Sequence, residues 1–361
     1  MAKARFQPAF VDLYAVPRMN ETRLKYLLAR FGEPEAVLAA KRDDLLAVEK
    51  VDKELATAIV DYKRSDETRQ RIKGAQAAGV ETIPFTSAGF PANLKDLAHM
   101  PPVLFVRGEI RDSDHLAIAV VGTRLASNYG RQVAEKLGQE LARSGVTVVS
   151  GLARGIDTYA HRGALTAGGR TIAVLGCGVD VYYPPENRKL QDEIAGHGAV
   201  ISEFPLGAEP LAMNFPKRNR VVSGLSRAVV AVEAGEKSGV LNTVAWALDQ
   251  GRDVYAVPGN VTAQQSVGTN RLLREGAKPV LCAEDVLSEL GLKVKREERA
   301  RVEVAEDERP VLDFLSSEPV HVDDICEGVG VPMAGLLSVL FQLEMKGLVR
   351  QLPGKLFVRE V

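Results

Sequence analysis

The chain has 361 residues, 46% of them hydrophobic, and its 46 basic and 47 acidic side chains leave a net charge of −1. This length suggests two or three domains, and the ordinary apolar content excludes a disordered chain. No apolar run approaches the roughly 18 residues of a membrane span, and residues 1–10 lack the apolar core of a signal peptide. We therefore expect a cytoplasmic protein without membrane contact. Its three cysteines are far apart, which fits a reducing compartment and no zinc site.

Residues 1–75 are predicted to form an all-α domain. Apolar residues recur at helical spacing between Leu24 and Phe31. Two stretches, 15–19 and 47–51, resemble each other, and their spacing suggests a pair of helix-hairpin-helix (SAM-like) units. Hairpins that bind DNA carry glycines, which let backbone N–H groups reach a phosphate, and neither half has them. A packing or docking domain is therefore favoured over a DNA contact.

Residues 76–291 are predicted to form an α/β domain with an extended Rossmann-like parallel sheet. An entry segment rich in proline and glycine, 79–108, comes first. It contains short apolar pieces such as 103–106 and is expected to add an edge strand. Six further strands are expected at 116–121, 146–150, 171–175, 200–202, 228–232 and 253–257. Helices between them include 129–143, 157–167 and 241–249, and a short final helix covers 284–290. Such alternation places helices on both faces and a ligand outside the carboxyl ends of the strands.

The last part of the chain is predicted to be a separate module behind a linker. Residues 292–309 are charge-dense and lack apolar periodicity, as linkers do. Residues 310–361 show three helical segments and a hairpin across Pro353-Gly354, which together predict a winged helix. In its longest helix the side chains expected to face inward are Leu336, Leu337, Leu340 and Leu343.

A transcription factor that reads duplex DNA through this winged helix is one alternative for the function. From Val320 to Met345, however, the only full charges are four carboxylates: Asp323, Asp324, Glu327 and Glu344. Phosphate repels a recognition helix that has no cation. A docking role for the module is therefore favoured.

Three stretches of the α/β domain are expected to meet as one phosphate-binding face: 149–157, 214–220 and 233–243. Each is a loop that opens a helix, and the free N–H groups of a helix N-terminus bind anions. The second stretch gives the strongest signal, because Lys217, Arg218 and Arg220 lie beside an aromatic residue, Phe215. Cations interleaved with aromatics suit a single strand of nucleic acid, whose phosphates need neutralising and whose bases can stack.

The candidate ligand-binding residues fall into three groups by what they would supply. Backbone N–H and hydroxyl donors to phosphate are expected from Gly122, Ser150, Gly151, Gly155, Ser238 and Gly239. Positive charge is expected from Arg124, Arg154, Lys217, Arg218 and Arg220. Thr123, Phe215 and Asn219 lie within the same loops, and a further wall is expected from residues 183–189, which include Asn187, Arg188 and Lys189. Contacts to the sugar-phosphate backbone do not distinguish one base from another, so the preference for a particular nucleotide sequence should be slight.

The sequence gives no indication of a cofactor, a metal site or catalysis. There is no G-x-G-x-x-G motif after the first strand of the parallel sheet, so dinucleotide binding is not supported. The histidines are scattered without metal-ligand spacing. Asp157 and His161 are four residues apart, but an acidic residue in a first helical turn is already favoured by the helix dipole. We interpret that pair as structural and expect no enzymatic activity.

The motifs of the α/β domain resemble those of the DNA-processing protein A family (DprA, also called Smf). The resemblance rests on seven motifs that follow one another along residues 79–277: Gly122-Thr123-Arg124, 150–161, 171–176, Tyr183-Pro184, 201–205, 215–220 and 256–259. It implies a bacterial cytoplasmic protein that binds and protects single-stranded DNA on an extended Rossmann domain. It further implies delivery of that DNA to the RecA recombinase during natural transformation and homologous recombination, and dimerisation through the Rossmann domain.

The main alternative is a nucleotide-binding enzyme on the same type of sheet. The phosphate-binding turn after a late strand resembles that of the cytokinin-activating phosphoribohydrolases. Their P-G-G-x-G-T-x-x-E motif would fall on residues 238–243 and place the catalytic acid at Trp246. A tryptophan cannot perform general acid–base catalysis, so the hypothesis that the chain is such an enzyme is disfavoured.

Overall fold

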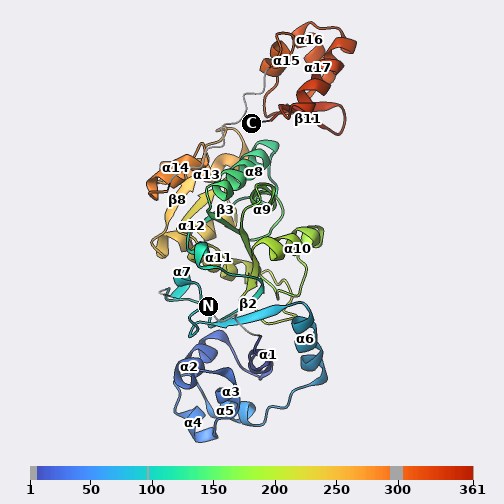
Figure 1. Ribbon diagram of the computed structural model, residues 1–361. Helices are drawn as coiled ribbons and strands as arrows, with labels where there is room; N and C mark the ends of the chain where they lie inside the picture. The colour runs from blue at the N-terminus through green and yellow to red at the C-terminus, as the bar shows by residue number, and fades with distance from the viewer. Residues whose placement is uncertain (1–5, 96, 293–303, 361) are drawn as a thin grey trace.

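The computed structural model describes residues 6–95, 97–292 and 304–360, which form three parts in chain order (Figure 1). A helical part lies at one end, a large α/β part in the middle and a small module at the other end. The predicted fold class, an α/β core with helical regions and a winged helix, is confirmed. The helix-hairpin-helix assignment and the limits of the domains stay predictions.

The N-terminal part consists of helices, as predicted. Polar side chains start three of them: Asn20, Asp52 and Ser65 each accept a hydrogen bond from the backbone N–H three residues later, which satisfies an otherwise unpaired donor of the first turn. The helices are α1 (Pro8–Ala15), α2 (Glu21–Phe31), α3 (Pro34–Leu38), α4 (Arg42–Leu46), α5 (Lys53–Val60) and α6 (Asp66–Ala77).

The core of these helices continues into the central part. Phe10 and Leu13 of α1 are fully buried in one cluster with Val103, Phe105 and Leu206 of the α/β part. These residues are far apart in the sequence, yet their side chains pack in one apolar core. The helical part is therefore fixed to the sheet by hydrophobic burial.

The central part is built on a nine-stranded sheet in the order β1-β2-β6-β5-β4-β3-β7-β8-β9. The seven strands from β6 to β9 are parallel, whereas β2 pairs antiparallel with both β1 and β6. The strands are β1 (Val80–Pro84), β2 (Val103–Gly108), β3 (Ala117–Val121), β4 (Thr147–Ser150), β5 (Thr171–Val174), β6 (Ala199–Ser202), β7 (Ala228–Ala231), β8 (Asp253–Ala256) and β9 (Lys278–Pro279). The six strands predicted for the parallel part are confirmed to within one residue at each end.

The entry segment 79–108 supplies an edge strand, as predicted, but its apolar piece at 103–106 is not that strand. That piece is β2, which lies between β1 and β6, and the edge is taken by β1. Four of the five residues of β1 are buried, and the strand ends at Pro84. Proline has no N–H for a second neighbour, so it suits an edge position.

Helices cover both faces of the sheet, as expected for a parallel sheet. Successive strand residues point to opposite faces: Val120 and Val148 pack in one core cluster, with α8 and α9, and Val121 and Val149 in the other, with α11 and α12. The helices of this part are α7 (Ala92–Lys95), α8 (Asn128–Arg143), α9 (Ile156–Thr166), α10 (Arg188–His197), α11 (Asn214–Leu225), α12 (Val240–Asp249), α13 (Val267–Arg274) and α14 (Ala283–Glu289).

The C-terminal module is a winged helix, as predicted. It comprises α15 (Arg309–Phe314), β10 (Val320–His321), α16 (Val322–Val329), α17 (Met333–Met345), β11 (Val349–Leu352) and β12 (Leu356–Arg359), with strand order β10-β12-β11. Most of the predicted linker lies outside the described residues. One inward assignment is wrong: Leu336, Leu340 and Leu343 are buried, but Leu337 is 49% exposed, because it lies one position off their spacing of three and four.

Within the described ranges, no single helix has the length and apolar character needed to cross a membrane. Only α16 and α17 taken together pass such a test by length and composition, and they are bent by 109° at their junction.

Candidate nucleic-acid interface

A cleft opens where the chain reverses its direction across the sheet. From β3 the strand order continues to β4 on one side and to β7 on the other. Ligands of open α/β sheets bind at such a switch point, outside the carboxyl ends of the strands. The loops after these three strands line a cleft of about 810 Å³, together with the first turns of α11 and α12. This is the edge at which the sequence predicted its phosphate-binding face.

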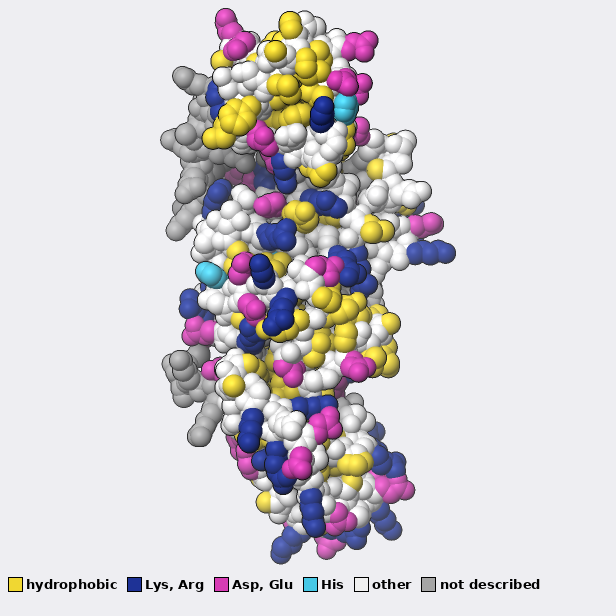
Figure 2. All heavy atoms as spheres, turned by 90° about the vertical axis from the view of Figure 1, so that its right-hand side faces the viewer, with side chains coloured by type: hydrophobic (Ala, Val, Ile, Leu, Met, Phe, Trp, Pro, Cys, Tyr) yellow, Lys and Arg dark blue, Asp and Glu magenta, His cyan; other side chains and the backbone are white. Residues whose placement is uncertain are grey.

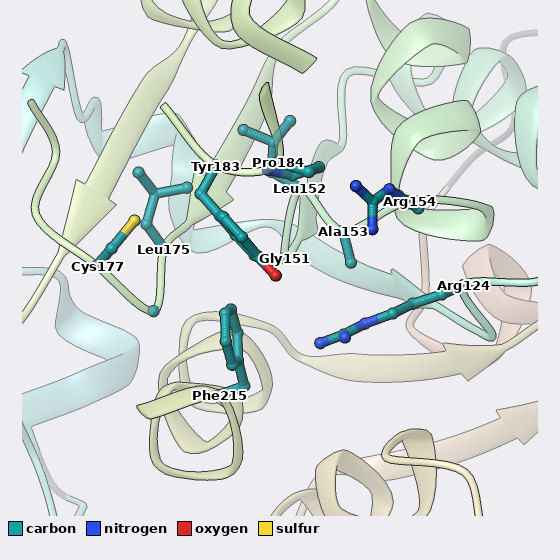
Figure 3. Close-up of a pocket in the computed structure, with 11 residues that line it drawn as sticks. Arg124, Gly151, Leu152, Ala153, Arg154, Leu175, Cys177, Tyr183, Pro184 and Phe215 are labelled. Atoms are coloured by element: carbon teal, nitrogen blue, oxygen red, sulfur yellow. The ribbon is translucent and has the colours of Figure 1, made fainter. Parts of the chain in front are cut away.

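Three side chains from separate segments form a flat-sided slot at one end of this cleft (Figure 3). The guanidinium carbon of Arg124 lies 5.3 Å from the centre of the Phe215 ring. The Tyr183 ring centre lies 5.5 Å from that of Phe215, with the two planes inclined by 38°. The floor is apolar and includes Leu152 and Leu175. Two aromatic rings and a planar cation around one opening can hold a flat ring and a nearby anion.

Arg124 is the cation best placed to meet a ligand. It follows β3, its side chain is exposed, and among the described residues no carboxylate lies within ion-pair distance of it. In Figure 3 it extends toward the space between Tyr183 and Phe215. Its positive charge is therefore available to an anion bound in the cleft.

Asp157 organises the loop after β4 from within. Its carboxylate accepts the backbone N–H groups of Gly151 (3.1 Å) and Ala153 (3.3 Å) and interacts with that of Gly122. Burial raises the pKa of this carboxyl, while Arg218 and these donors act to lower it. The N–H of Gly151, expected to bind phosphate, is thus already satisfied by the protein.

Three more of the predicted polar ligands are occupied by internal partners. The Ser150 hydroxyl donates to the Val120 carbonyl oxygen (2.7 Å). Asn187 donates from Nδ2 to the Leu152 carbonyl oxygen (3.0 Å) and to the Thr158 hydroxyl (2.9 Å). Arg218 is 5% exposed and donates to the carbonyl oxygens of Gly151 (2.6 Å) and Val174, and burial lowers its pKa. These groups hold the cleft together.

Lys217 and Arg220 point away from the cleft, toward the N-terminal helices. Lys217 pairs with Glu21 at the start of α2, and its ammonium nitrogen lies 5.5 Å from the centre of the Phe204 ring. Arg220 pairs with the buried Glu203 and lies 3.9 Å from a Glu21 oxygen. Burial raises the pKa of Glu203 to about 7, and Arg220 opposes the shift. The carboxylates of Glu21 and Glu203 therefore neutralise Lys217 and Arg220, which were predicted from the sequence to bind phosphate.

The wall predicted at 183–189 is only partly in the cleft. Arg154 lines the cleft and pairs with Glu186, which raises the pKa of the arginine and lowers that of the carboxyl. Arg188 lies 4.6 Å over the ring of Tyr182, and Lys189 is exposed. Neither of these two basic residues is among those that line the cleft.

Five of the remaining predicted residues line the cleft, and Gly155 supports the loop beside it. Gly122, Thr123, Asn219, Ser238 and Gly239 belong to its lining. Asn219 donates to the side-chain oxygen of Asn242 (3.2 Å). Gly155 starts α9 with φ of +73°, and any Cβ there would collide with the Thr123 carbonyl oxygen, so only glycine fits.

One assumption about the second stretch is wrong: residues 214–220 lie inside α11, which begins at Asn214, and not in a loop before it. Tyr183 belongs to the wall predicted at 183–189 but was not named as a ligand, and it forms one side of the slot. Its position after the β5 strand, directly before Pro184, was the available signal.

The described residues contain no group of three or more histidine, cysteine or acidic side chains that could hold a metal ion. His161 is fully buried and its Nδ1 lies 2.6 Å from the Thr171 hydroxyl. Burial lowers its pKa to about 3. His161 is therefore a buried group held neutral, and the interpretation of the Asp157–His161 pair as structural stays a prediction.

Comparison with known proteins assigns the family. The family model described as DNA recombination-mediator protein A matches residues 81–291, and that of the DprA winged helix domain matches residues 295–355. The chain belongs to the DprA/Smf family. Protein Smf of Synechocystis sp. is 36% identical over 75% of this chain and 78% of its own length. Membership makes the chain a DNA-processing recombination mediator and confirms the resemblance found in the sequence.

Two solved DprA structures share the fold. The X-ray structure of DNA processing protein A from Streptococcus pneumoniae has a TM-score of 0.67 at 32% identity, covering 79% of this chain and 98% of its own. The protein from Helicobacter pylori, studied for its single-stranded DNA binding mode, has a TM-score of 0.53 at 30% identity, covering 58% of this chain and 95% of its own.

Proposed function

We propose that this DprA-family protein binds and protects single-stranded DNA in the cleft and delivers it to the RecA recombinase during natural transformation. The observation that carries the DNA site is the slot of Arg124, Tyr183 and Phe215 at the switch point of the sheet. A base can stack against the rings while Arg124 neutralises the neighbouring phosphate. The binding mode studied for the Helicobacter pylori relative supports the same ligand.

The contacts expected from this geometry explain why a single strand is preferred. In a duplex the bases are paired and stacked on one another, so their faces are not available for stacking on protein rings. An unpaired base is free to do so, and such stacking tolerates any base because each has a π-face. Sequence preference should therefore be slight.

A titration with single-stranded and duplex oligonucleotides at several salt concentrations tests the proposal. The Arg124→Ala variant should weaken single-strand binding for every sequence alike and reduce the salt slope by roughly 0.7 for one lost phosphate contact. The matched control is Arg274→Ala, since Arg274 is exposed on α13 and does not line the cleft. An unchanged salt slope in a folded Arg124→Ala variant would remove Arg124 from the site.

We also propose that the cleft holds DNA without chemical turnover. Asp157 is the carboxylate among its described lining residues, and this side chain is buried and already accepts backbone N–H groups. Trp246, at the position of the phosphoribohydrolase acid, packs edge-on against His99 with ring centres 5.9 Å apart. Incubation with nucleoside monophosphates or labelled DNA should release neither free base nor cleaved strand; product in excess of the protein would support the enzyme reading.

We propose a cytoplasmic homodimer that forms through the Rossmann-like part. Exposed apolar side chains follow the adjacent strands β8 and β9: Val261 is 85% exposed and Leu281 is 76% exposed. Such residues on a soluble fold favour a self-complementary contact. Sedimentation of Leu281→Glu against the wild type tests this, with Leu248→Glu on α12 as the control; a dimer unaffected by Leu281→Glu would place the interface elsewhere.

A further inference from the structure

The winged helix leaves an apolar stripe uncovered on α17. Leu337, Phe341 and Met345 are 49%, 63% and 74% exposed in the whole chain. Their spacing of four residues aligns them along one face of the helix. The opposite face fills the core of the module with Leu336, Val339, Leu340 and Leu343. The stripe therefore contributes little to folding.

Figure 2 shows hydrophobic side chains gathered on the face of this module at the top of the view, with acidic side chains around them. The module's contact with the sheet domain does not use this face. It runs through β12, where Gln132 of α8 donates to the Arg359 carbonyl oxygen (3.2 Å). An apolar surface left open by both the module and its neighbour is typical of a contact site for another molecule.

The charge around the stripe is negative. Residues 304–360 include ten acidic and five basic side chains. The basic groups are largely compensated within the module: Lys346 pairs with Glu308, Arg350 with Glu360, and Arg359 lies 3.8 Å from Asp313.

On α16, which packs against α17, the carboxylates of Asp324 and Glu327 are exposed. Within residues 304–360 and the other described ranges, no cation lies within ion-pair distance of either. Glu344 of α17 is directed elsewhere, because its carboxylate accepts the backbone N–H of Gln351 in β11 (3.0 Å). The helix that carries the apolar stripe thus packs against a helix with two exposed carboxylates that have no ion-pair partner among the described residues.

This combination selects the kind of partner. Nucleic acid is disfavoured because phosphates are repelled by carboxylates. A second copy is disfavoured as well, because a symmetric contact would bring the same carboxylates together. We propose that α17 docks a basic amphipathic helix of a partner protein. Its apolar anchors lie on Leu337, Phe341 and Met345, and its lysine or arginine side chains pair with Asp324 and Glu327. This site is separate from the DNA cleft.

Selection from a displayed library tests the proposal on the full-length chain. The library holds helical peptides of about 16 residues, with apolar anchors at positions i, i+4 and i+7 and random residues between them. Peptides enriched on the wild type should carry net positive charge. Their affinity should fall about tenfold in Phe341→Ala, should weaken with salt, and should fall again in a Glu327→Lys variant.

Controls separate a docking surface from general stickiness or misfolding. Phe341 is exposed, so its variant should keep the wild-type melting temperature. Leu248→Ala removes an equally exposed apolar side chain from α12 (64% exposed) and should leave peptide binding unchanged. The proposal is overturned if no peptide is enriched over the Phe341→Ala target, or if the enriched peptides are neutral or acidic. Self-association that Phe341→Ala abolishes would assign the stripe to a second copy and overturn it too.

Discussion

The loop after β3 and the first turns of α11 carry the same kind of side chain and use it in opposite ways. Arg124 on the loop is exposed and stacks over Phe215. On α11, Arg218 is buried against carbonyl oxygens, and Arg220 is buried against Glu203. The number of basic residues in a segment therefore does not give the positive charge that is available to a ligand. Arg218 and Arg220 bind partners from distant segments and stabilise the fold. Arg124 has no such polar partner among the described residues, so it can bind a ligand.

The largest effect is expected from Arg220→Gln, which tests the structural side of this comparison. Removing one partner leaves Glu203 as a buried, uncompensated carboxylate, and such losses cost about 3–5 kcal/mol. Urea unfolding should show this fall in the free energy of unfolding, and Arg227→Gln, at an exposed position, should not. A folded Arg220→Gln of wild-type stability that has lost DNA binding would make Arg220 a ligand.

The pH dependence of stability should reveal the same buried pair. Because the pKa of Glu203 is raised to about 7 in the folded state, the folded protein binds this proton more tightly than the unfolded chain. The resulting stabilisation is complete below about pH 4.5 and is lost as the pH rises through about 7. Thermal unfolding of Glu203→Gln between pH 5 and 8 should therefore follow a flatter curve than the wild type. Parallel curves would show that Glu203 stays ionised throughout this range.

A smaller effect is expected from Phe215→Leu, on the ligand side of the comparison. Leucine keeps the apolar contact but loses the face on which a base stacks, a loss of about 1–3 kcal/mol. Fluorescence anisotropy should show single-strand affinity reduced roughly tenfold, with the salt slope unchanged. Phe85→Leu, a half-buried ring away from the cleft, is the control. Equal losses in both variants would indicate a general effect on folding.

The smallest effect is expected from Glu21→Gln, which frees Lys217. Both side chains are partly exposed, so the ion pair should contribute less than about 1 kcal/mol to stability. Single-strand affinity should stay within about twofold, because Lys217 points away from the cleft. Glu67→Gln on α6 provides a matched loss of one ion pair with Arg71. A several-fold gain in affinity with a steeper salt slope would show that Lys217 can reach phosphate, and the contrast with Arg124 would fail.

The strands of the parallel sheet could be predicted because each is a short, continuous apolar run, which indicates a strand buried on both faces. The loops after β3, β4 and β7 could be placed at one edge because parallel strands end together. The partners of the α11 cations could not be predicted: Lys217 and Glu21 are 196 residues apart in sequence, and no local pattern couples them. The start of α11 had a signal that was missed, since Pro216 in the first turn favours a helix.

The apolar cluster that joins α1 to β2 has a consequence for how the protein unfolds. Since Phe10 and Leu13 share one interior with Val103 and Phe105, neither the helices nor the β1–β2 hairpin can lose its packing alone. The described residues from 6 to 292 should therefore behave as one cooperative unit with a single melting transition, although they look like two domains in sequence. The winged helix has a complete core of its own, so it is the part able to melt independently.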